Sequence, residues 1–304
     1  MTDLATSIGS VRLRAPVLTA SGTAGHGAEF AHYMKPAALG AVVVKSMKAG
    51  EWAGNPPPRV HPTAAGMINS VGLQGKGIPH WLEHELPDLV ATGATVVASI
   101  WGNSIDDFRA AADALAGAPP EVVAVEVNVS CPNLEDRSKM FAHSAASTRE
   151  AVAATAGCGR PRWAKLSPNA ADLPEIAVAA HEAGADAVVL TNTLLGMVID
   201  TESRRPVLGA KKGGLSGSAM HPVAIRAVYD VHEAAPHLPI VGVGGTAGGI
   251  DVVEFLLAGA SAVEVGTATF ADPRAPRRIL KEFSNWCDRH GVVDIAELIG
   301  AAHG

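Results

Sequence analysis

The sequence predicts one large (β/α)8 barrel, an α/β fold, and three observations lead to this fold class. The chain has 304 residues, which suits a barrel of about 250 residues with insertions. Eight short apolar runs recur along it, and amphipathic, alanine-rich segments lie between several of them. The runs are continuously apolar, as in parallel strands covered on both faces. A doubly wound open sheet is the second choice.

The predicted strands and helices alternate along the chain. Four segments have a helical pattern, and the first of them follows a capping pair, Asn103-Ser104. These four segments are Asp106–Leu115, Leu173–Ala183, His221–Glu233 and Gly248–Ala258. The eight predicted strands are Pro16–Ala20, Ala41–Ser46, Thr95–Ile100, Val122–Val129, Arg162–Leu166, Ala187–Thr191, Pro239–Val243 and Ala262–Gly266.

Three stretches exceed a minimal barrel. Leu4–Leu13 resembles a hairpin that closes the barrel bottom, with its turn near Gly9-Ser10. Lys48–Gly77 and Leu194–Leu215 are long loops, and loops of this length usually serve a site. In a barrel such loops gather at the C-terminal face, where activity resides. Because no repeat or linker interrupts the chain, residues 1–304 are interpreted as a single domain.

Composition excludes several classes of protein. Hydrophobic residues make up 48% of the chain and charged residues 18%, which is typical of a globular protein. The net charge of −6 provides no general attraction to nucleic acid or to an anionic membrane. No apolar stretch reaches the ~18–20 residues of a membrane span, and no signal peptide is visible. The three cysteines have no CxxC spacing, so we expect neither a disulfide scaffold nor a zinc site, and a cytoplasmic location.

The strongest phosphate-binding signal lies late in the chain. The seventh predicted strand ends in Val241-Gly-Val-Gly-Gly-Thr246, and the eighth ends in Val265-Gly-Thr-Ala-Thr269. Glycines allow backbone N–H groups to approach a phosphate, and barrels commonly hold a phosphate at these two loops. Alternatively, these glycines could form ordinary tight turns that bind no ligand. A dinucleotide fingerprint beginning at Gly242 is less favoured, because six strands precede it and Glu264 lies inside a strand.

Two lysines lie at the ends of predicted apolar strands, Lys45 at the second and Lys165 at the fifth. A lysine in such a strand is unfavourable unless it is paired or takes part in chemistry. Its ammonium group could compensate the negative charge of a reduced flavin or of a substrate carboxylate. Alternatively, Lys165 could form a Schiff base, as in a barrel aldolase.

Cys131 follows the fourth predicted strand in Asn128-Val-Ser-Cys-Pro-Asn133. A lone cysteine is more often a buried small hydrophobe than a catalyst. The polar neighbours Asn128, Ser130 and Asn133 favour a site, because such groups orient a heterocyclic substrate.

His80 and His84 have i, i+4 spacing but no third ligand, so a solvated helix face is favoured and no metal site is predicted.

Ten short segments with polar and glycine residues follow one another along the chain: Thr19-Ala-Ser-Gly22, Val44-Lys-Ser46, Gly54-Asn-Pro-Pro-Pro-Arg59, Asn69-Ser-Val-Gly-Leu-Gln74, Asn128-Val-Ser-Cys-Pro-Asn133, Lys165-Leu-Ser-Pro-Asn169, Thr191-Asn-Thr-Leu-Leu-Gly196, Gly213-Gly-Leu-Ser-Gly217, Gly242-Val-Gly-Gly245 and Val265-Gly-Thr-Ala-Thr-Phe270. Taken in this order, they resemble the class 1 dihydroorotate dehydrogenases over nearly the whole chain. The stretch from Asn192 through Arg204-Arg205-Pro206 to Gly217 is most similar to the NAD-linked subtype, 1B.

The resemblance implies an FMN-filled barrel that oxidises (S)-dihydroorotate to orotate in pyrimidine biosynthesis. It assigns Cys131 as the base that takes the C5 proton, while a hydride passes to flavin N5. The residues implied to face the flavin are Ser21, Lys45, Ser46, Asn103, Asn128, Lys165 and Thr191. Those implied to hold its phosphate are Gly217, Gly244, Gly245, Gly266 and Thr267. Those implied to contact the substrate are Lys45, Asn69, Ser70, Val71, Gly72, Leu73, Asn128, Asn133, Asn192 and Thr193.

The subtype also implies partners. A separate subunit carrying FAD and an iron–sulfur cluster would pass electrons to NAD. The chain itself would form a homodimer or be part of a heterotetramer. Class 2 relatives use serine as base and carry a membrane-associating extension, and this sequence has neither feature. It departs from the family pattern at Gly75-Lys-Gly77, at Trp101 and at Thr191. The first two departures lie near the implied substrate and flavin surfaces, so another dihydropyrimidine remains an alternative substrate.

Overall fold

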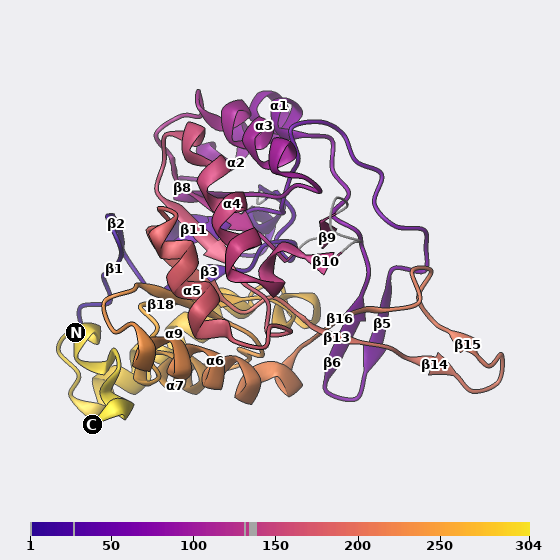
Figure 1. Cartoon of the computed structure of the whole chain (residues 1–304). Helices are drawn as coiled ribbons and strands as arrows, with labels where there is room; N and C mark the ends of the chain where they lie inside the picture. The colour runs from indigo at the N-terminus through magenta and orange to yellow at the C-terminus, as the bar shows by residue number, and fades with distance from the viewer. Residues whose placement is uncertain (1, 27, 131, 134–138) are drawn as a thin grey trace.

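A computed structural model describes residues 2–26, 28–130, 132–133 and 139–304 (Figure 1). Eight parallel strands form a closed barrel in the order β3-β4-β7-β8-β11-β12-β17-β18, which confirms the (β/α)8 prediction and rules out an open, doubly wound sheet. Each strand lies within one of the eight predicted apolar runs. Their bounds are β3 Val17–Thr19, β4 Ala41–Val43, β7 Val96–Ile100, β8 Val122–Asn128, β11 Arg162–Lys165, β12 Ala187–Leu190, β17 Ile240–Val243 and β18 Ala262–Val265.

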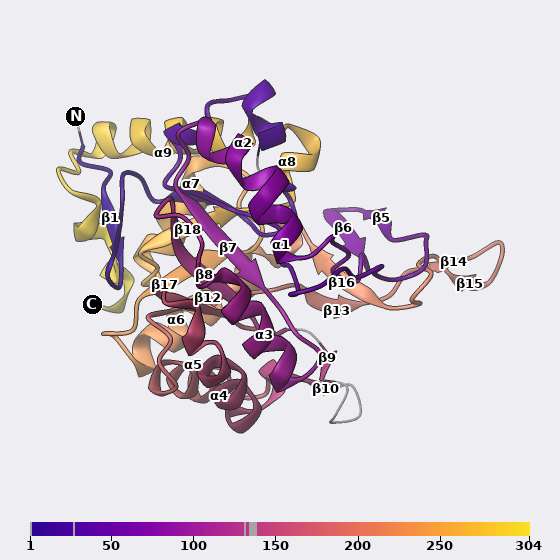
Figure 2. The same ribbon diagram turned by 90° about the horizontal axis from the view of Figure 1, so that it is seen from above.

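Helices surround the barrel (Figures 1 and 2). The four predicted helices are confirmed, and each end differs by at most one residue. Ser104 caps α3 as predicted, since its hydroxyl accepts a hydrogen bond from Asp107 N at 3.2 Å. The helices are α1 Ile78–His80, continued by a π-helical turn Trp81–Glu85 and by α2 Leu86–Ala91, then α3 Ile105–Leu115, α4 Ala145–Ala154, α5 Leu173–Glu182, α6 His221–Ala234, α7 Gly249–Leu257, α8 Ala268–Ala271 and α9 Ala275–His290.

Shorter turns complete the helical layer. Among the helices of the described residues, none is both long enough and apolar enough to cross a bilayer. The 3-10 turns are Ala28–His32, Pro36–Ala38, Phe141–His143, Ala156–Cys158, Ser218–Met220, Ile295–Leu298 and Ala301–His303.

The N-terminal hairpin closes the bottom of the barrel. Strand β1 (Thr6–Ile8) pairs with β2 (Val11–Leu13), and the pairing of Ile8 with Val11 leaves Gly9 and Ser10 as the predicted turn. Side chains alternate along the hairpin, so that Ile8 and Val11 are buried and Arg12 is exposed. Ile8 belongs to the same apolar cluster as Trp163, which points into the barrel.

The two long loops build a second sheet above the barrel. Its order is β13-β16-β6-β5, all antiparallel, and the arm β14–β15 projects beyond it (Figures 1 and 2). Only loops are predicted here. Two of the pairings, β5 with β6 and β13 with β16, lie within one loop each, whereas the pairing of β16 with β6 joins the two loops across more than 100 residues. Gly66 permits the close approach, since a Cβ there would strike the carbonyl oxygen of Ser216. The bounds are β5 Val60–Thr63, β6 Gly66–Asn69, β13 Leu194–Gly196, β14 Ile199–Asp200, β15 Arg205–Pro206 and β16 Gly213–Ser216, and a separate short pair is β9 Pro132–Asn133 with β10 Lys139–Met140.

Ile8→Ala should lower the free energy of unfolding by about 2–5 kcal/mol, because it leaves a cavity in the plug of the barrel. Arg12→Ala is the matched control on the exposed face of the same hairpin, and it should change stability by less than about 0.5 kcal/mol. Urea denaturation of both variants measures the difference. Equal effects of the two substitutions would show that the hairpin does not stabilise the barrel.

Candidate functional site

A cavity of about 350 Å³ opens at the carboxyl ends of the barrel strands. This size lies within the ~300–1,000 Å³ of small-molecule sites. Its walls come both from the strand ends and from the second sheet, so segments far apart in sequence meet there. Eighteen of the predicted site residues line it: Ser21, Lys45, Ser46, Asn69, Ser70, Val71, Gly72, Leu73, Asn128, Lys165, Thr191, Asn192, Thr193, Gly217, Gly244, Gly245, Gly266 and Thr267.

The other three predicted site residues are Asn103, Asn133 and Cys131, and of these only Asn103 has a described side chain. Asn103 is not among its lining residues, and the Asn103 backbone N–H bonds Asp107 Oδ2 at 2.8 Å at the start of α3. Asn133 is described only by its backbone, which pairs with Lys139. Cys131, the predicted base, lies outside the described residues.

One end of the cavity is lined by backbone at the predicted phosphate loops. Gly244 and Gly245 follow β17, and Gly266 follows β18. Gly245 has a φ of 72°, and a Cβ there would lie 2.6 Å from His221 N. A Cβ at Gly244 would lie 2.6 Å from Cβ of Ala224. Side chains are therefore excluded, which leaves backbone groups to face a bound phosphate.

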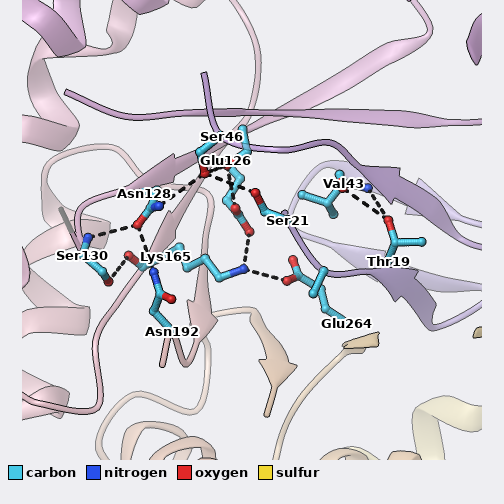
Figure 3. A network of polar contacts seen from close by, with 12 residues as sticks. Thr19, Ser21, Val43, Ser46, Glu126, Asn128, Ser130, Lys165, Asn192 and Glu264 are labelled. Atoms are coloured by element: carbon cyan, nitrogen blue, oxygen red, sulfur yellow. Dashed lines mark hydrogen bonds and ion pairs between the residues drawn. The ribbon is translucent and has the colours of Figure 1, made fainter. Parts of the chain in front are cut away.

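A network of hydroxyls and amides forms another part of the wall (Figure 3). The Ser46 hydroxyl lies 3.1 Å from that of Ser21 and 2.8 Å from that of Ser99, and it accepts a hydrogen bond from Asn128 Nδ2 at 3.3 Å. Asn192 Nδ2 donates to Asn128 Oδ1 at 3.2 Å. Because these bonds fix the side chains, the wall is preorganised for a polar, planar ligand.

Two hydroxyls on the cavity wall have no hydrogen-bond partner among the described residues. Thr191 Oγ1 and Ser70 Oγ are buried and make no hydrogen bond with a described residue. A buried polar atom without a partner costs about 1–3 kcal/mol. These hydroxyls therefore fit a bound group that supplies the missing partners, as the polar edge of a flavin ring or of a pyrimidine would.

Lys45 presents a cation to the cavity. Its side chain is half-buried, and no ion pair joins it to an acidic residue within the described part of the chain. Burial, with a smaller contribution from the positive charge of Arg59, lowers the pKa of Lys45. Since a desolvated ammonium without a counter-ion is unfavourable, the position suits an anionic group of a ligand.

Lys165 reaches below the cavity floor to two carboxylates. Its Nζ lies 2.9 Å from Glu264 Oε2 and 3.2 Å from Glu126 Oε2, and both glutamates are fully buried (Figure 3). Burial alone would lower the pKa of Lys165, but the charges of Glu126 and Glu264 together outweigh it and raise that pKa. The two carboxylates therefore favour the charged form of Lys165.

Neither glutamate is among the predicted site residues. A signal existed, because each is an acidic residue within an apolar strand. Glu126 also lies two residues before Asn128, and that spacing places both side chains on the inner face of the barrel.

A cluster of metal-binding residue types lies outside the cavity lining. His221 Nε2 is 2.7 Å from Glu254 Oε2 and 3.8 Å from Asp251 Oδ1. The other carboxylate oxygen of Asp251 accepts hydrogen bonds from two backbone N–H groups at the start of α7. The rings of His80 and His84 lie with their centres 4.5 Å apart and their planes inclined by 52°, and neither histidine belongs to this cluster.

Comparison with known proteins gives a consistent result. A family model described as dihydroorotate dehydrogenase matches residues 3–286. The chain is 43% identical over 303 residues to the protein named dihydroorotate dehydrogenase B (NAD(+)), catalytic subunit, of Geobacter sp. (strain M21), with 98% of each chain covered. A protein of the same name from Desulforudis audaxviator is 46% identical over 300 residues, which cover 98% of this chain and 97% of the relative. Another, from Bacteroides thetaiotaomicron, is 41% identical over 302 residues, 99% of each chain.

Proposed function

Because the chain belongs to the dihydroorotate dehydrogenase family, we propose that it oxidises (S)-dihydroorotate to orotate in pyrimidine biosynthesis, with FMN bound in the barrel cavity. The observation that carries the proposal is the cavity itself. It combines a glycine-lined end, a wall of fixed amides and hydroxyls, and two lysines. These are the groups that a flavin mononucleotide and a small anionic heterocycle require.

The FMN phosphate would be held by the backbone around Gly217, Gly244, Gly245 and Gly266, together with Thr267. Support comes from the close packing at Gly217, Gly244 and Gly245, where a Cβ would lie 2.4–2.6 Å from a neighbouring atom. The residues proposed to face the flavin ring are Ser21, Lys45, Ser46, Asn128, Lys165 and Thr191. Asn103 is proposed from the resemblance alone.

The substrate would lie between the flavin and the second sheet. Asn69, Asn192 and Thr193 can pair with the ring amides, and the Lys45 ammonium can pair with the carboxylate. The loop from Ser70 to Leu73 lines the same space. Loop-closing hydrogen bonds support its position, because Trp52 Nε1 donates to Gly72 O at 3.0 Å.

Cys131 is proposed as the base. Dihydroorotate loses a proton from C5 and a hydride from C6, and a ring double bond forms between them. A thiolate at Cys131 would take the proton and become a thiol. Bound FMN would supply the acceptor for the hydride. Support comes from the sequence position, since Ser130, the preceding residue, lines the cavity.

The names of the relatives suggest that a second subunit binds this chain. They are called catalytic subunits of an NAD(+)-linked enzyme, and we propose that a second subunit with FAD and an iron–sulfur cluster carries electrons from this chain to NAD.

The Schiff-base aldolase alternative is not favoured by the geometry. A lysine nucleophile must be an uncharged amine, which requires a lowered pKa. Lys165 has a raised pKa, because the charges of Glu126 and Glu264 outweigh its burial. Its ammonium is committed to two carboxylates at 2.9 and 3.2 Å.

The purified protein should contain FMN, and dihydroorotate added without oxygen should bleach the visible absorption of the flavin. Cys131→Ser should retain FMN but slow this reduction by about 100-fold or more at neutral pH, which is the typical contribution of a general base. Cys287→Ala, a buried cysteine on α9, is the control and should reduce at the normal rate. Protein that cannot take up FMN would refute the function. Bleaching by another dihydropyrimidine but not by dihydroorotate would reassign the substrate.

Lys45→Met should raise KM for dihydroorotate by about 10- to 100-fold, the equivalent of a lost charge-assisted hydrogen bond of about 1.5–3 kcal/mol. The pKa of Lys45 is lowered by burial, so the positive charge is lost at a lower pH than in a free lysine. In the wild type KM should therefore rise as the pH increases into the alkaline range. Steady-state kinetics against pH measures this rise, and Lys281→Met, an exposed lysine on α9, is the control. If the alkaline rise persists in Lys45→Met, another group binds the carboxylate.

Reduction of NAD by dihydroorotate should require a partner subunit. The isolated chain should pass electrons to an artificial dye but not to NAD, and addition of a copurified flavin and iron–sulfur subunit should start NAD reduction. Parallel assays with dye and with NAD separate the two activities. Reduction of NAD by the isolated chain would refute the proposed partner.

A further inference from the structure

The Glu126–Lys165–Glu264 cluster is not required by the proton and hydride steps proposed above. Its members come from three barrel strands, β8, β11 and β18, and all three side chains point inward (Figure 3). The glutamates are fully buried, and the lysine side chain is only 6% exposed. Lys165 lines the cavity, whereas the two glutamates lie beneath it.

The charges of this cluster do not balance if both glutamates are ionised. One ammonium would then face two carboxylates, which leaves one buried negative charge uncompensated. The other barrel strands, β3, β4, β7, β12 and β17, carry no ionisable side chain. Among the described residues that line the cavity, Lys45 is the one lysine or arginine besides Lys165. The low-polarity interior therefore favours one proton on the carboxyl pair.

The hydrogen bonds indicate which carboxyl holds this proton. Glu126 accepts from Ser99 at 2.7 Å and from Lys165 at 3.2 Å, so both of its oxygens have donors. Glu264 Oε2 accepts a hydrogen bond from Lys165 Nζ at 2.9 Å, and Glu264 Oε1 has no geometric hydrogen-bond partner among the described residues. Burial, followed by the nearby charge of Glu126, raises the pKa of Glu264 to about 8 against the opposing charge of Lys165.

A chain of hydroxyls connects the cluster to the cavity. Ser99 contacts Glu126, Ser46 lies 2.8 Å from Ser99, and Ser21 lies 3.1 Å from Ser46. Ser21 and Ser46 line the cavity. Each hydroxyl can both donate and accept, so a proton can move along this chain without the carboxyls becoming exposed to solvent.

We propose that the Glu126–Lys165–Glu264 cluster holds one exchangeable proton, centred on Glu264, whose binding is linked to the charge of the flavin above Lys165. The inference rests on the proposed FMN site. Bound FMN would gain one negative charge on reduction by two electrons and one proton, and Lys165 lines the cavity proposed to hold it. When Glu264 is ionised, its carboxylate then takes up a proton from the solvent, relayed by cavity water, so that an O–H bond forms on Glu264 and the relaying water is left neutral. When Glu264 already holds the proton, the charge of the cluster does not change.

The experiment is a titration of the flavin midpoint potential of the FMN-bound protein between about pH 6.5 and 9.5. One proton per two electrons gives a slope of about 30 mV per pH unit, and a second linked proton adds about another 30 mV. The wild type should show the smaller slope below about pH 8 and the larger slope above it. Glu264→Gln, which imitates the protonated acid, should match the wild type near pH 7 and keep the smaller slope throughout.

Two further variants and a measurement without flavin complete the design. Glu126→Gln should also lose the steeper slope, because the one remaining carboxylate then pairs fully with Lys165. Glu233→Gln, an exposed glutamate on α6, should retain it. A wild-type slope that does not change across pH 8, or an unchanged steep slope in Glu264→Gln, would overturn the proposal.

Unfolding of the FMN-free protein provides a readout that does not depend on the cofactor. The pKa of Glu264 is raised from 4.5 to about 8 on folding, so the unfolded chain releases this proton first. Wild-type stability should therefore fall as pH rises from about 4.5 to about 8. Glu264→Gln should remove this part of the pH dependence in urea denaturation. A protein that binds no FMN but shows this difference would refute the proposed function while retaining the proton site.

Discussion

Closure of eight parallel strands into a barrel forces alternate side chains of every strand into one narrow interior, and most features of this protein depend on that constraint. Apolar side chains fill the lower part, where the N-terminal hairpin packs against them. Farther along the strands the same inward positions carry Glu126, Lys165 and Glu264. At the carboxyl ends they carry the polar groups of the cavity. Along the barrel axis, the inward side chains thus change from apolar groups that pack, to charged groups, to the polar groups that line the cavity.

The electrostatics of the interior follow from this placement. A charged lysine inside a barrel is stable only with counter-charges, and two glutamates, one on β8 and one on β18, provide them. One ammonium can balance the charge of only one of the two carboxylates. The interior therefore holds a proton at a pH near 7. By contrast, Lys45 has no acidic partner in the described structure and is left to a ligand. The two lysines, alike in sequence context, therefore have different roles.

The second sheet has a different physical origin. Its strands come from two loops, and glycine at Gly66 allows the backbone of one to lie against Ser216 of the other. The sheet covers the cavity and carries Asn69, while hydrogen bonds from Trp52 and Arg59 hold the adjacent loop. A ligand in the cavity is thus enclosed by segments that the barrel alone does not provide.

The sequence by itself determined the barrel, its eight strands, the bottom hairpin and most of the cavity lining. These depend on local patterns: apolar runs of strand length, a helix cap at Ser104, and glycines after β17 and β18. Only the tertiary structure decided how the two loops join into one sheet and how the cluster around Lys165 forms, because both bring together residues far apart in the chain. Glu126 and Glu264 are far apart in the sequence, yet both contact the same ammonium group, that of Lys165. Pairing of this kind depends on strand order and register, which a single sequence does not encode locally.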